Sequence, residues 1–159
     1  MNQFLKNHGK IAIIGIGNEL KGDDGLGSII AKKLSKLFQK NQNLFVFDGG
    51  TVPENYTSSI RKINPTHIIL IDAVEMGEET GYIRLIDKKE IANYNISTHA
   101  MPISFLIRYM EATIGSKIIL VGIQPKSMQL TEGISKEVET SIEFLINTLF
   151  KFINSPKKT

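Results

Sequence analysis

A buried strand runs directly into a glycine-rich turn near the start of the chain, and this turn ends in two adjacent acids. The segment reads Ile11-Ala-Ile-Ile-Gly-Ile-Gly-Asn-Glu-Leu-Lys-Gly-Asp-Asp-Gly25. An isoleucine-rich run of this kind is typical of a parallel strand that is covered on both faces. Gly-x-Gly after such a strand usually indicates a phosphate cradle. Here Asp23 and Asp24 would repel a phosphate, so the turn suits a cation or a group that carries one.

Strand-like and helix-like segments alternate along the rest of the chain. Short apolar runs predict strands, and apolar residues at helical spacing predict helices. The expected strands are residues 10–16, 44–47, 67–71, 82–86 and 117–122, and the expected helices are 25–39, 54–63, 102–113 and 135–152. This alternation predicts an α/β fold with three layers (α/β/α), in which a mostly parallel, twisted sheet of about five strands carries helices on both faces.

Length and composition limit the classes of protein that this chain can belong to. Its 159 residues, of which 42% are apolar, predict one domain, with a core over residues 10–150 and a frayed basic tail over 151–159. The absence of cysteine excludes thiolate chemistry and suits a cytoplasmic protein. A net charge of +3 without a basic, aromatic-bearing stripe argues against nucleic acid as a partner. No apolar run approaches the roughly 20 residues of a membrane span, so we expect no membrane insertion.

Three potential metal ligands fall at one edge of the expected sheet. Asp24 follows the first strand, Asp72 closes the third, and His99 lies in the loop before the helix that begins near Pro102. Ligands of open parallel sheets bind beyond the carboxyl ends of the strands, where these segments can meet. Two carboxylates and one imidazole, with coordination positions left open, suit a borderline divalent cation such as nickel or zinc.

Each of these residues also has a simpler structural interpretation. Asp24 can be the N-cap of the following helix, because aspartate is a favoured N-cap residue. Asp72 can cap a turn, and a loop histidine such as His99 is most often only solvated. Glu19 and Asp23 are alternative site acids, and spacing alone does not separate them from Asp24.

Other polar residues carry weaker signals. Asp48, at the end of the second strand, occupies the place where a dinucleotide-binding fold would hold a ribose. The glycine fingerprint of such folds fails, however, because the third glycine position is Leu20. His8, in a polar leader, and His67, at the opposite edge of the sheet, are expected to be solvated.

Five motifs, in this order, resemble those of the hydrogenase maturation endopeptidases. They are Gly15-Ile-Gly-Asn-Glu-Leu-Lys-Gly-Asp-Asp-Gly25, Asp48-Gly-Gly-Thr51, Ile71-Asp-Ala-Val-Glu-Met-Gly77, Thr98-His-Ala-Met-Pro102 and Gly122-Ile-Gln-Pro125. The resemblance covers most of the chain, from about residue 10 to residue 146. In detail the motifs look most similar to the branch that serves energy-converting or coenzyme F420-reducing NiFe hydrogenases.

The resemblance implies an endopeptidase that removes the C-terminal extension of a NiFe hydrogenase large-subunit precursor after nickel insertion. The metal-binding residues of that family fall on Asp24, Asp72 and His99, and this correspondence selects Asp24 over Asp23. The implied partner is the large-subunit precursor, which supplies the nickel as a recognition tag. No organic cofactor is implied, and we expect that other divalent cations can occupy the site in vitro.

The expected catalytic and metal-binding residues are therefore Asp24, Asp72 and His99. Gly49, Gly50 and Thr51 are candidates for contact with the substrate, because glycines let a peptide backbone approach closely. A plain turn explains these glycines equally well. The attacking water can be activated by one of the two carboxylates or by the metal, and the sequence leaves both open.

Other functions fit parts of the sequence. A non-cleaving, metal-sensing chaperone would bind the nickel-loaded large subunit without cutting it, and a nucleotide-binding α/β module would use the first glycine turn. Peptidyl-tRNA hydrolases begin with a similar strand and Gly-x-Gly-Asn, but they follow the asparagine with Pro-Gly. Here Glu19 and Leu20 follow Asn18.

Overall fold

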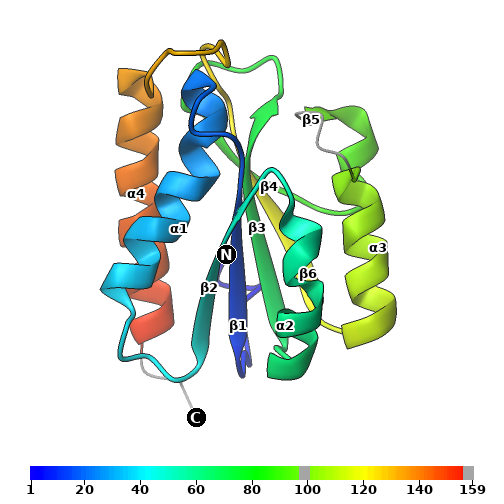
Figure 1. Ribbon diagram of the computed structural model, residues 1–159. Helices are drawn as coiled ribbons and strands as arrows, with labels where there is room; N and C mark the ends of the chain where they lie inside the picture. The colour runs from blue at the N-terminus through cyan, green and yellow to red at the C-terminus, as the bar shows by residue number, and fades with distance from the viewer. Residues whose placement is uncertain (97–100, 156–159) are drawn as a thin grey trace.

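Four parallel strands, three of them rich in isoleucine, form the centre of the computed structural model, which describes residues 1–96 and 101–155 (Figure 1). They are β1 (Ile11–Ile16), β2 (Leu44–Gly50), β3 (His67–Glu75) and β6 (Lys117–Ile123), in the order β2-β1-β3-β6. Strand β4 (Ile83–Ile86) extends the sheet antiparallel to β6, and the two-residue strand β5 (Asn95–Ile96) pairs with β3. The predicted mostly parallel α/β sheet is confirmed, with one short strand more than expected.

Helices cover both faces of this sheet (Figure 1). Helices α1 (Leu26–Leu37) and α4 (Lys136–Asn154) lie on one face, and α2 (Thr57–Ile63) and α3 (Ile103–Ile114) lie on the other. Strand side chains alternate between the two cores: Ile13 packs with the first pair of helices and Ile14 with the second. This is the predicted three-layer arrangement. No helix in the described part of the chain combines the length and apolar character needed to cross a membrane.

The strands β2 and β3 are longer than the sequence predicts. Strand β3 continues past residue 71 to Glu75, because β6 pairs with its extension and places Asp72 opposite Gly122. Strand β2 likewise continues through Asp48 to Gly50, which pairs with Ile16 across a register shift. Both acids therefore lie inside strands, where an apolar pattern alone would have ended the element.

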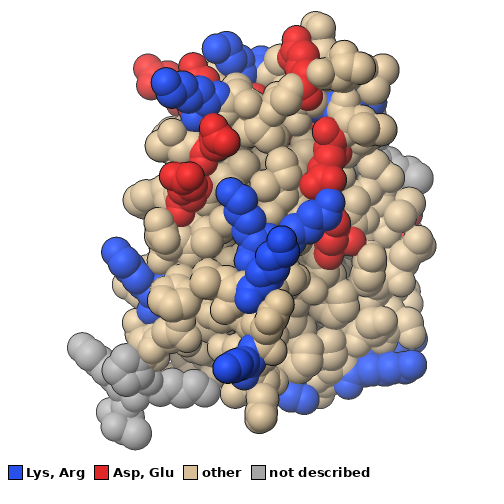
Figure 2. All heavy atoms as spheres, turned by 60° about the vertical axis from the view of Figure 1, so that its left-hand side comes forward, with Lys and Arg blue, Asp and Glu red and all other residues tan. Residues whose placement is uncertain are grey.

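The C-terminal helix is also longer than predicted. The helix was expected to end at residue 152, but α4 continues to Asn154, into the stretch 151–159 that was expected to be a basic tail. The reason is apolar packing, because Phe152 and Ile153 rest against the core beneath α1 and α4. Lysines lie interspersed with acids on the face that carries these two helices (Figure 2).

The histidine at the start of β3 is buried rather than solvated. His67 is 2% exposed, and the ring of Phe4 packs edge-on against it with centroids 5.1 Å apart. Its Nδ1 lies 2.8 Å from the hydroxyl of Thr66. Burial lowers the pKa of His67 from its usual value, and the nearby Lys117 lowers this pKa further. The prediction of a solvated ring is wrong because residues near the N-terminus, Phe4 among them, cover this edge of the sheet.

A glycine allows the first turn of α1 to touch the strands directly. A Cβ atom at Gly27 would lie 2.5 Å from the carbonyl oxygen of Ile71 and 2.5 Å from the backbone nitrogen of Ile16. Both of these atoms belong to backbone that cannot move aside cheaply. The start of α1, and the turn before it, are therefore held at the carboxyl ends of β1 and β3.

We predict that Gly27→Ala destabilises the protein by about 1–3 kcal/mol through overpacking. The sign of this change in stability is informative. Alanine in a helix interior is normally about 1 kcal/mol more favourable than glycine, so a loss of stability would show that the contact at Gly27 outweighs helix propensity. Urea denaturation gives the free energy of unfolding. Gly133→Ala is the matched control, since a Cβ there meets nothing within 4 Å, and it should change stability by less than about 0.5 kcal/mol. A Gly27→Ala protein as stable as the parent would show that this contact is not tight.

Candidate functional site

The two adjacent acids of the first turn have different surroundings. Both are buried in the 3-10 turn η1 (Gly22–Gly25), between β1 and α1. The carboxylate of Asp23 accepts hydrogen bonds from the backbone N–H of Lys126 at 2.8 Å and from the N–H of Ser135 at 2.6 Å. Asp24 accepts one from the N–H of Asn18 through Oδ2 at 3.0 Å, and its Oδ1 has no hydrogen-bond partner among the described residues. Asp23 thus serves the fold, whereas Asp24 keeps an oxygen for a ligand.

Asp24 is not the N-cap of α1. The N-cap residue is Gly25, and no side chain caps the helix there. Asp24 lies in η1, one residue before this N-cap, and its side chain reaches back to Asn18, just beyond the end of β1. The capping interpretation is therefore wrong.

The first glycine turn binds its own acid-bearing segment rather than an anion. A Cβ atom at Gly17 would collide with the carbonyl oxygen of Asp24, and Gly17 has a φ of 141°. The turn's N–H groups are also occupied: Gly17 donates to the carbonyl of Gly50 at 2.9 Å, and Leu20 donates to Oδ1 of Asn18 at 2.9 Å. Few donors remain for a phosphate, which counts against a nucleotide-binding module.

Asp72 lies at the same edge of the sheet as Asp24. Strand β1 pairs with β3 as far as Ile71, so Asp72 is the first residue of β3 beyond that pairing. It is fully buried, and its Oδ1 accepts a hydrogen bond from the N–H of Ala73 at 2.9 Å. Strand β3 contacts η1, and Gly27 touches the residue before Asp72. The structure thus places the two predicted acids at the same edge of the sheet, and the turn-cap interpretation of Asp72 is wrong because Asp72 lies inside β3.

His99 lies outside the described residues, so the three-ligand site stays a prediction. The segments on either side of it are placed. Strand β5 pairs with β3 at Val74, two residues beyond Asp72, and α3 begins at Ile103. By strand alternation Asp72 faces the side of the sheet that α3 covers, as its neighbours Leu70 and Val74 do. Within residues 1–96 and 101–155, no group of three His, Cys, Asp or Glu side chains is arranged to hold a metal.

A shallow pocket of about 380 Å³ opens between the first glycine turn and the end of β2. Its lining consists of Gly17, Asn18, Glu19, Leu20, Ser28, Asp48, Gly50 and Thr51. Of the three candidates for substrate contact, Gly50 and Thr51 line this pocket. Gly49 does not, and a Cβ there would lie 3.0 Å from the carbonyl oxygen of Gly15, which gives Gly49 a packing role.

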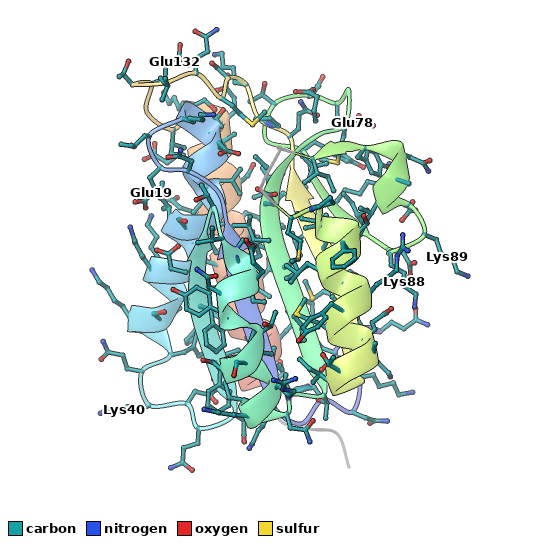
Figure 3. The ribbon with its side chains drawn as sticks, turned by 45° about the vertical axis from the view of Figure 1, so that its right-hand side comes forward. Glu19, Lys40, Glu78, Lys88, Lys89 and Glu132 are labelled. Atoms are coloured by element: carbon teal, nitrogen blue, oxygen red, sulfur yellow. The ribbon has the colours of Figure 1, made fainter. Side chains whose placement is uncertain are left out.

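Glu19 belongs to the surface of this pocket rather than to the buried acids. It lies on the outer side of the turn (Figure 3), and its carboxylate accepts a hydrogen bond from Lys32 Nζ at 2.6 Å. The same ammonium lies 3.8 Å from Asp48 Oδ2. The hydrogen bond to Glu19 raises the pKa of Lys32. Exposed pairs of this kind add little stability, and the single ammonium offsets only part of the charge of the two acids beside the pocket.

Two residues with defined roles at this edge were not singled out by the sequence. Asp23 was only one of several candidate acids, and Gln124 was noted only within its motif. Gln124 is 4% exposed, and its Oε1 accepts a hydrogen bond from the N–H of Met76 at 2.7 Å. A polar residue directly after a buried strand and directly before Pro125 is the signal that could have drawn attention to it.

Comparison with known proteins gives consistent matches along the chain. The model of a family described as HycI, hydrogenase maturation protease, matches residues 29–152. A putative hydrogenase maturation protease from Methanocaldococcus jannaschii is 42% identical over 96% of this chain and 94% of that protein. Coenzyme F420 hydrogenase subunit delta from Methanothermobacter thermautotrophicus is 26% identical over 88% and 94%, respectively. The crystal structure of a NiFe hydrogenase maturation protease HycI from Thermococcus kodakarensis superposes with a TM-score of 0.89, at 28% identity over 97% of this chain and 98% of that one.

Proposed function

The chain belongs to the hydrogenase maturation protease family, and on this premise we propose that it removes the C-terminal extension of a NiFe hydrogenase large-subunit precursor. It is a peptide-bond hydrolase, as that family is. The proposed cleavage follows nickel insertion, and the proposed compartment is the cytoplasm, in keeping with a chain that has no cysteine. The observation that carries the proposal is the buried carboxylate of Asp24, whose Oδ1 has no hydrogen-bond partner in the described part of the chain.

Nickel belongs to the substrate in this proposal, and the free oxygen of Asp24 is where it is recognised. A buried polar atom without a partner costs about 1–3 kcal/mol, and a cation that binds there removes this cost. The bond from Asn18 to Oδ2 fixes the direction in which Oδ1 points. Asp72 supplies the second carboxylate, and His99 is proposed as the third ligand. Two oxygens and one nitrogen suit a borderline cation and select against a purely hard or purely soft one.

The pocket beside the first turn is the proposed site of the precursor peptide. Gly50 has space above it, since a Cβ there would meet nothing within 4 Å, and Thr51 is exposed at the pocket lining. Binding the nickel then fixes the scissile bond beside the acids, so that the peptide and the catalytic groups no longer have to meet by diffusion. Water attacks the carbonyl carbon and loses its proton, and the C–N bond breaks as the leaving amine is protonated. The carboxylate of Asp24 or Asp72 would take this proton as the general base. Alternatively, the nickel of the precursor would lower the pKa of the attacking water, whose proton would then pass to solvent, and the donor set permits both routes.

We predict that cleavage requires nickel in the precursor. Intact-mass analysis of a nickel-loaded large-subunit precursor should show loss of a C-terminal peptide after incubation with this protein, and a nickel-free precursor should stay whole. Cleavage of both forms would keep the protease and remove nickel as the recognition tag. Binding of the loaded precursor without any cleavage would favour the non-cleaving chaperone instead.

We predict that Asp24→Asn, Asp72→Asn and His99→Ala each lower processing by at least about 100-fold, the lower range for loss of a catalytic acid or base. The fold should remain, because asparagine keeps an oxygen for the N–H of Asn18 or Ala73. Circular dichroism checks the fold, and the rate of precursor cleavage checks the role.

Asp87→Asn is the matched control for these acids. Asp87 is exposed and accepts a hydrogen bond from the N–H of Lys89 at 3.0 Å. The control therefore makes the same aspartate-to-asparagine change in a local side-chain-to-backbone contact outside the site. Its cleavage rate should equal that of the parent. Normal processing by the Asp24, Asp72 and His99 variants would remove these residues from the site.

We predict that Thr51→Trp raises KM for the nickel-loaded precursor several-fold, because the ring fills the pocket. Thr51 is exposed, so stability should change by less than about 0.5 kcal/mol. Thr113→Trp, at an exposed position near the end of α3, is the control and should leave KM unchanged. An unchanged KM in Thr51→Trp would show that the peptide does not use this pocket.

A further inference from the structure

The segment between β6 and α4, residues 124–135, crosses the edge of the sheet where the two site acids lie. It leaves β6 beside the end of β3 and reaches the start of α4 after passing η1 (Figure 1). Figure 3 shows Glu132 of this segment at the same end of the sheet as Glu19 and Glu78, whereas Lys40 lies at the opposite end. The segment therefore has the turn that bears Asp24 on one side and the extension of β3 that bears Asp72 on the other.

Asp23 fastens this segment to the first turn. Its Oδ2 accepts hydrogen bonds from the N–H of Lys126 at 2.8 Å, the N–H of Ser127 at 3.4 Å and the hydroxyl of Ser135 at 2.8 Å. Its Oδ1 accepts one from the N–H of Ser135 at 2.6 Å. One buried carboxylate thus holds both ends of the segment, and bonds of this charge-assisted kind are the strong ones.

Backbone contacts continue the same attachment. The N–H of Asp23 donates to the carbonyl of Ser127 at 2.9 Å, and the N–H of Gly22 donates to the carbonyl of Glu132 at 3.1 Å. In the other direction, the N–H of Thr131 donates to the carbonyl of Leu20 at 2.9 Å. Three backbone hydrogen bonds therefore join the turn and the segment in addition to those of the Asp23 side chain.

Gln124, the first residue of the segment, fastens it to the end of β3. Its Oε1 accepts from the N–H of Met76 at 2.7 Å and from that of Glu78 at 3.3 Å. Its Nε2 donates to Oε1 of Glu75 at 2.6 Å and to the carbonyl of Pro125 at 3.2 Å. Three of these bonds go to Glu75, Met76 and Glu78, which lie three to six residues after Asp72 in the chain. The Gln124 side chain therefore fixes the position of the end of β3.

We infer that Asp23 and Gln124 are positioning residues, which set the distance between Asp24 and Asp72 through the segment 124–135. Asp23 precedes Asp24 in the buried turn η1, so the bonds to the Asp23 carboxylate also hold the backbone that carries Asp24. Ligands are held in productive geometry by such supporting contacts. A misplacement of about 1 Å in a site of this kind can cost on the order of 100-fold in rate. The inference rests on the proposed function.

The experiment compares Asp23→Asn and Gln124→Glu with the parent protein. In Asp23→Asn, an NH2 group replaces an oxygen that accepts hydrogen bonds from N–H groups of the segment. In Gln124→Glu, an oxygen replaces the NH2 group that donates to the carboxylate of Glu75. For folded protein below its melting transition, kcat and KM are measured on the nickel-loaded precursor, and the affinity for Ni²⁺ alone is measured by calorimetry. We expect kcat to fall by roughly 10- to 100-fold and the Ni²⁺ affinity to fall by at least about tenfold.

Ser116→Ala is the control for a purely structural loss. Ser116 is buried at the opposite edge of the sheet, and its hydroxyl donates to the carbonyl of Pro65 at 2.6 Å. This variant should lose stability and keep both kcat and Ni²⁺ affinity. Should Asp23→Asn fail to fold, Ser135→Ala removes one of the four bonds, and we expect a smaller drop in kcat and affinity in the same direction.

The inference is overturned if Asp23→Asn, or Ser135→Ala in its place, matches the parent in both measurements, or if Ser116→Ala loses as much of each. Asp24→Asn, run alongside, separates this failure from that of the proposed function. An active parent with an inactive Asp24→Asn and an active Asp23→Asn removes only the positioning role. A parent that neither cleaves the precursor nor binds Ni²⁺ overturns both.

Discussion

The close approach of α1 to the sheet is the constraint on which the rest of this structure depends. Gly27 lets backbone meet backbone at the ends of β1 and β3, where any side chain would force the helix away. The turn η1 is carried with the helix, so Asp24 arrives at the level of Asp72 without a long loop to place it. An edge of the sheet that would otherwise be open to water is thereby filled with buried acids.

The two neighbouring acids divide two tasks that usually compete. A carboxylate buried with four donors is a strong structural contact, and a carboxylate with an empty oxygen is a poor one. Asp23 is the structural contact, and Asp24 is the acid that keeps an oxygen without a hydrogen bond. The bonds to Asp23 stabilise the turn in which Asp24 is held at this energetic cost. Local strain or unmet bonding of this kind is commonly found at functional sites, where the surrounding structure compensates for it.

Most of the fold could be predicted from the sequence, because a buried parallel strand appears in it as a short, nearly continuous run of apolar residues. The alternation with amphipathic helices predicted the three layers, and the motifs predicted the family, which the comparisons confirm. The ends of β2 and β3 were missed because Asp48 and Asp72 look like loop residues until a partner strand is present. The burial of His67 was missed because it depends on Phe4, which is far away in sequence.

The site was predicted in part. The position of Asp24 and Asp72 at one edge follows from parallel topology, but the separate roles of Asp23 and Asp24 do not. Those roles depend on which carboxylate meets the N–H groups of residues more than a hundred positions later in the chain, at Lys126 and Ser135. No periodicity or local spacing in the sequence records such a contact. His99 stays a prediction, since it lies outside the described residues.

The way the first turn uses its own N–H groups has a consequence for the anions that can bind there. Donors that cradle phosphate in look-alike turns are here occupied by Gly50 and by the side chains of Asp24 and Asn18. Nucleotides and free phosphate are abundant competitors for any open turn of this shape. This turn offers them few contacts and two repelling carboxylates. The turn is therefore a poor site for these anions, while Oδ1 of Asp24 keeps an oxygen for a cation.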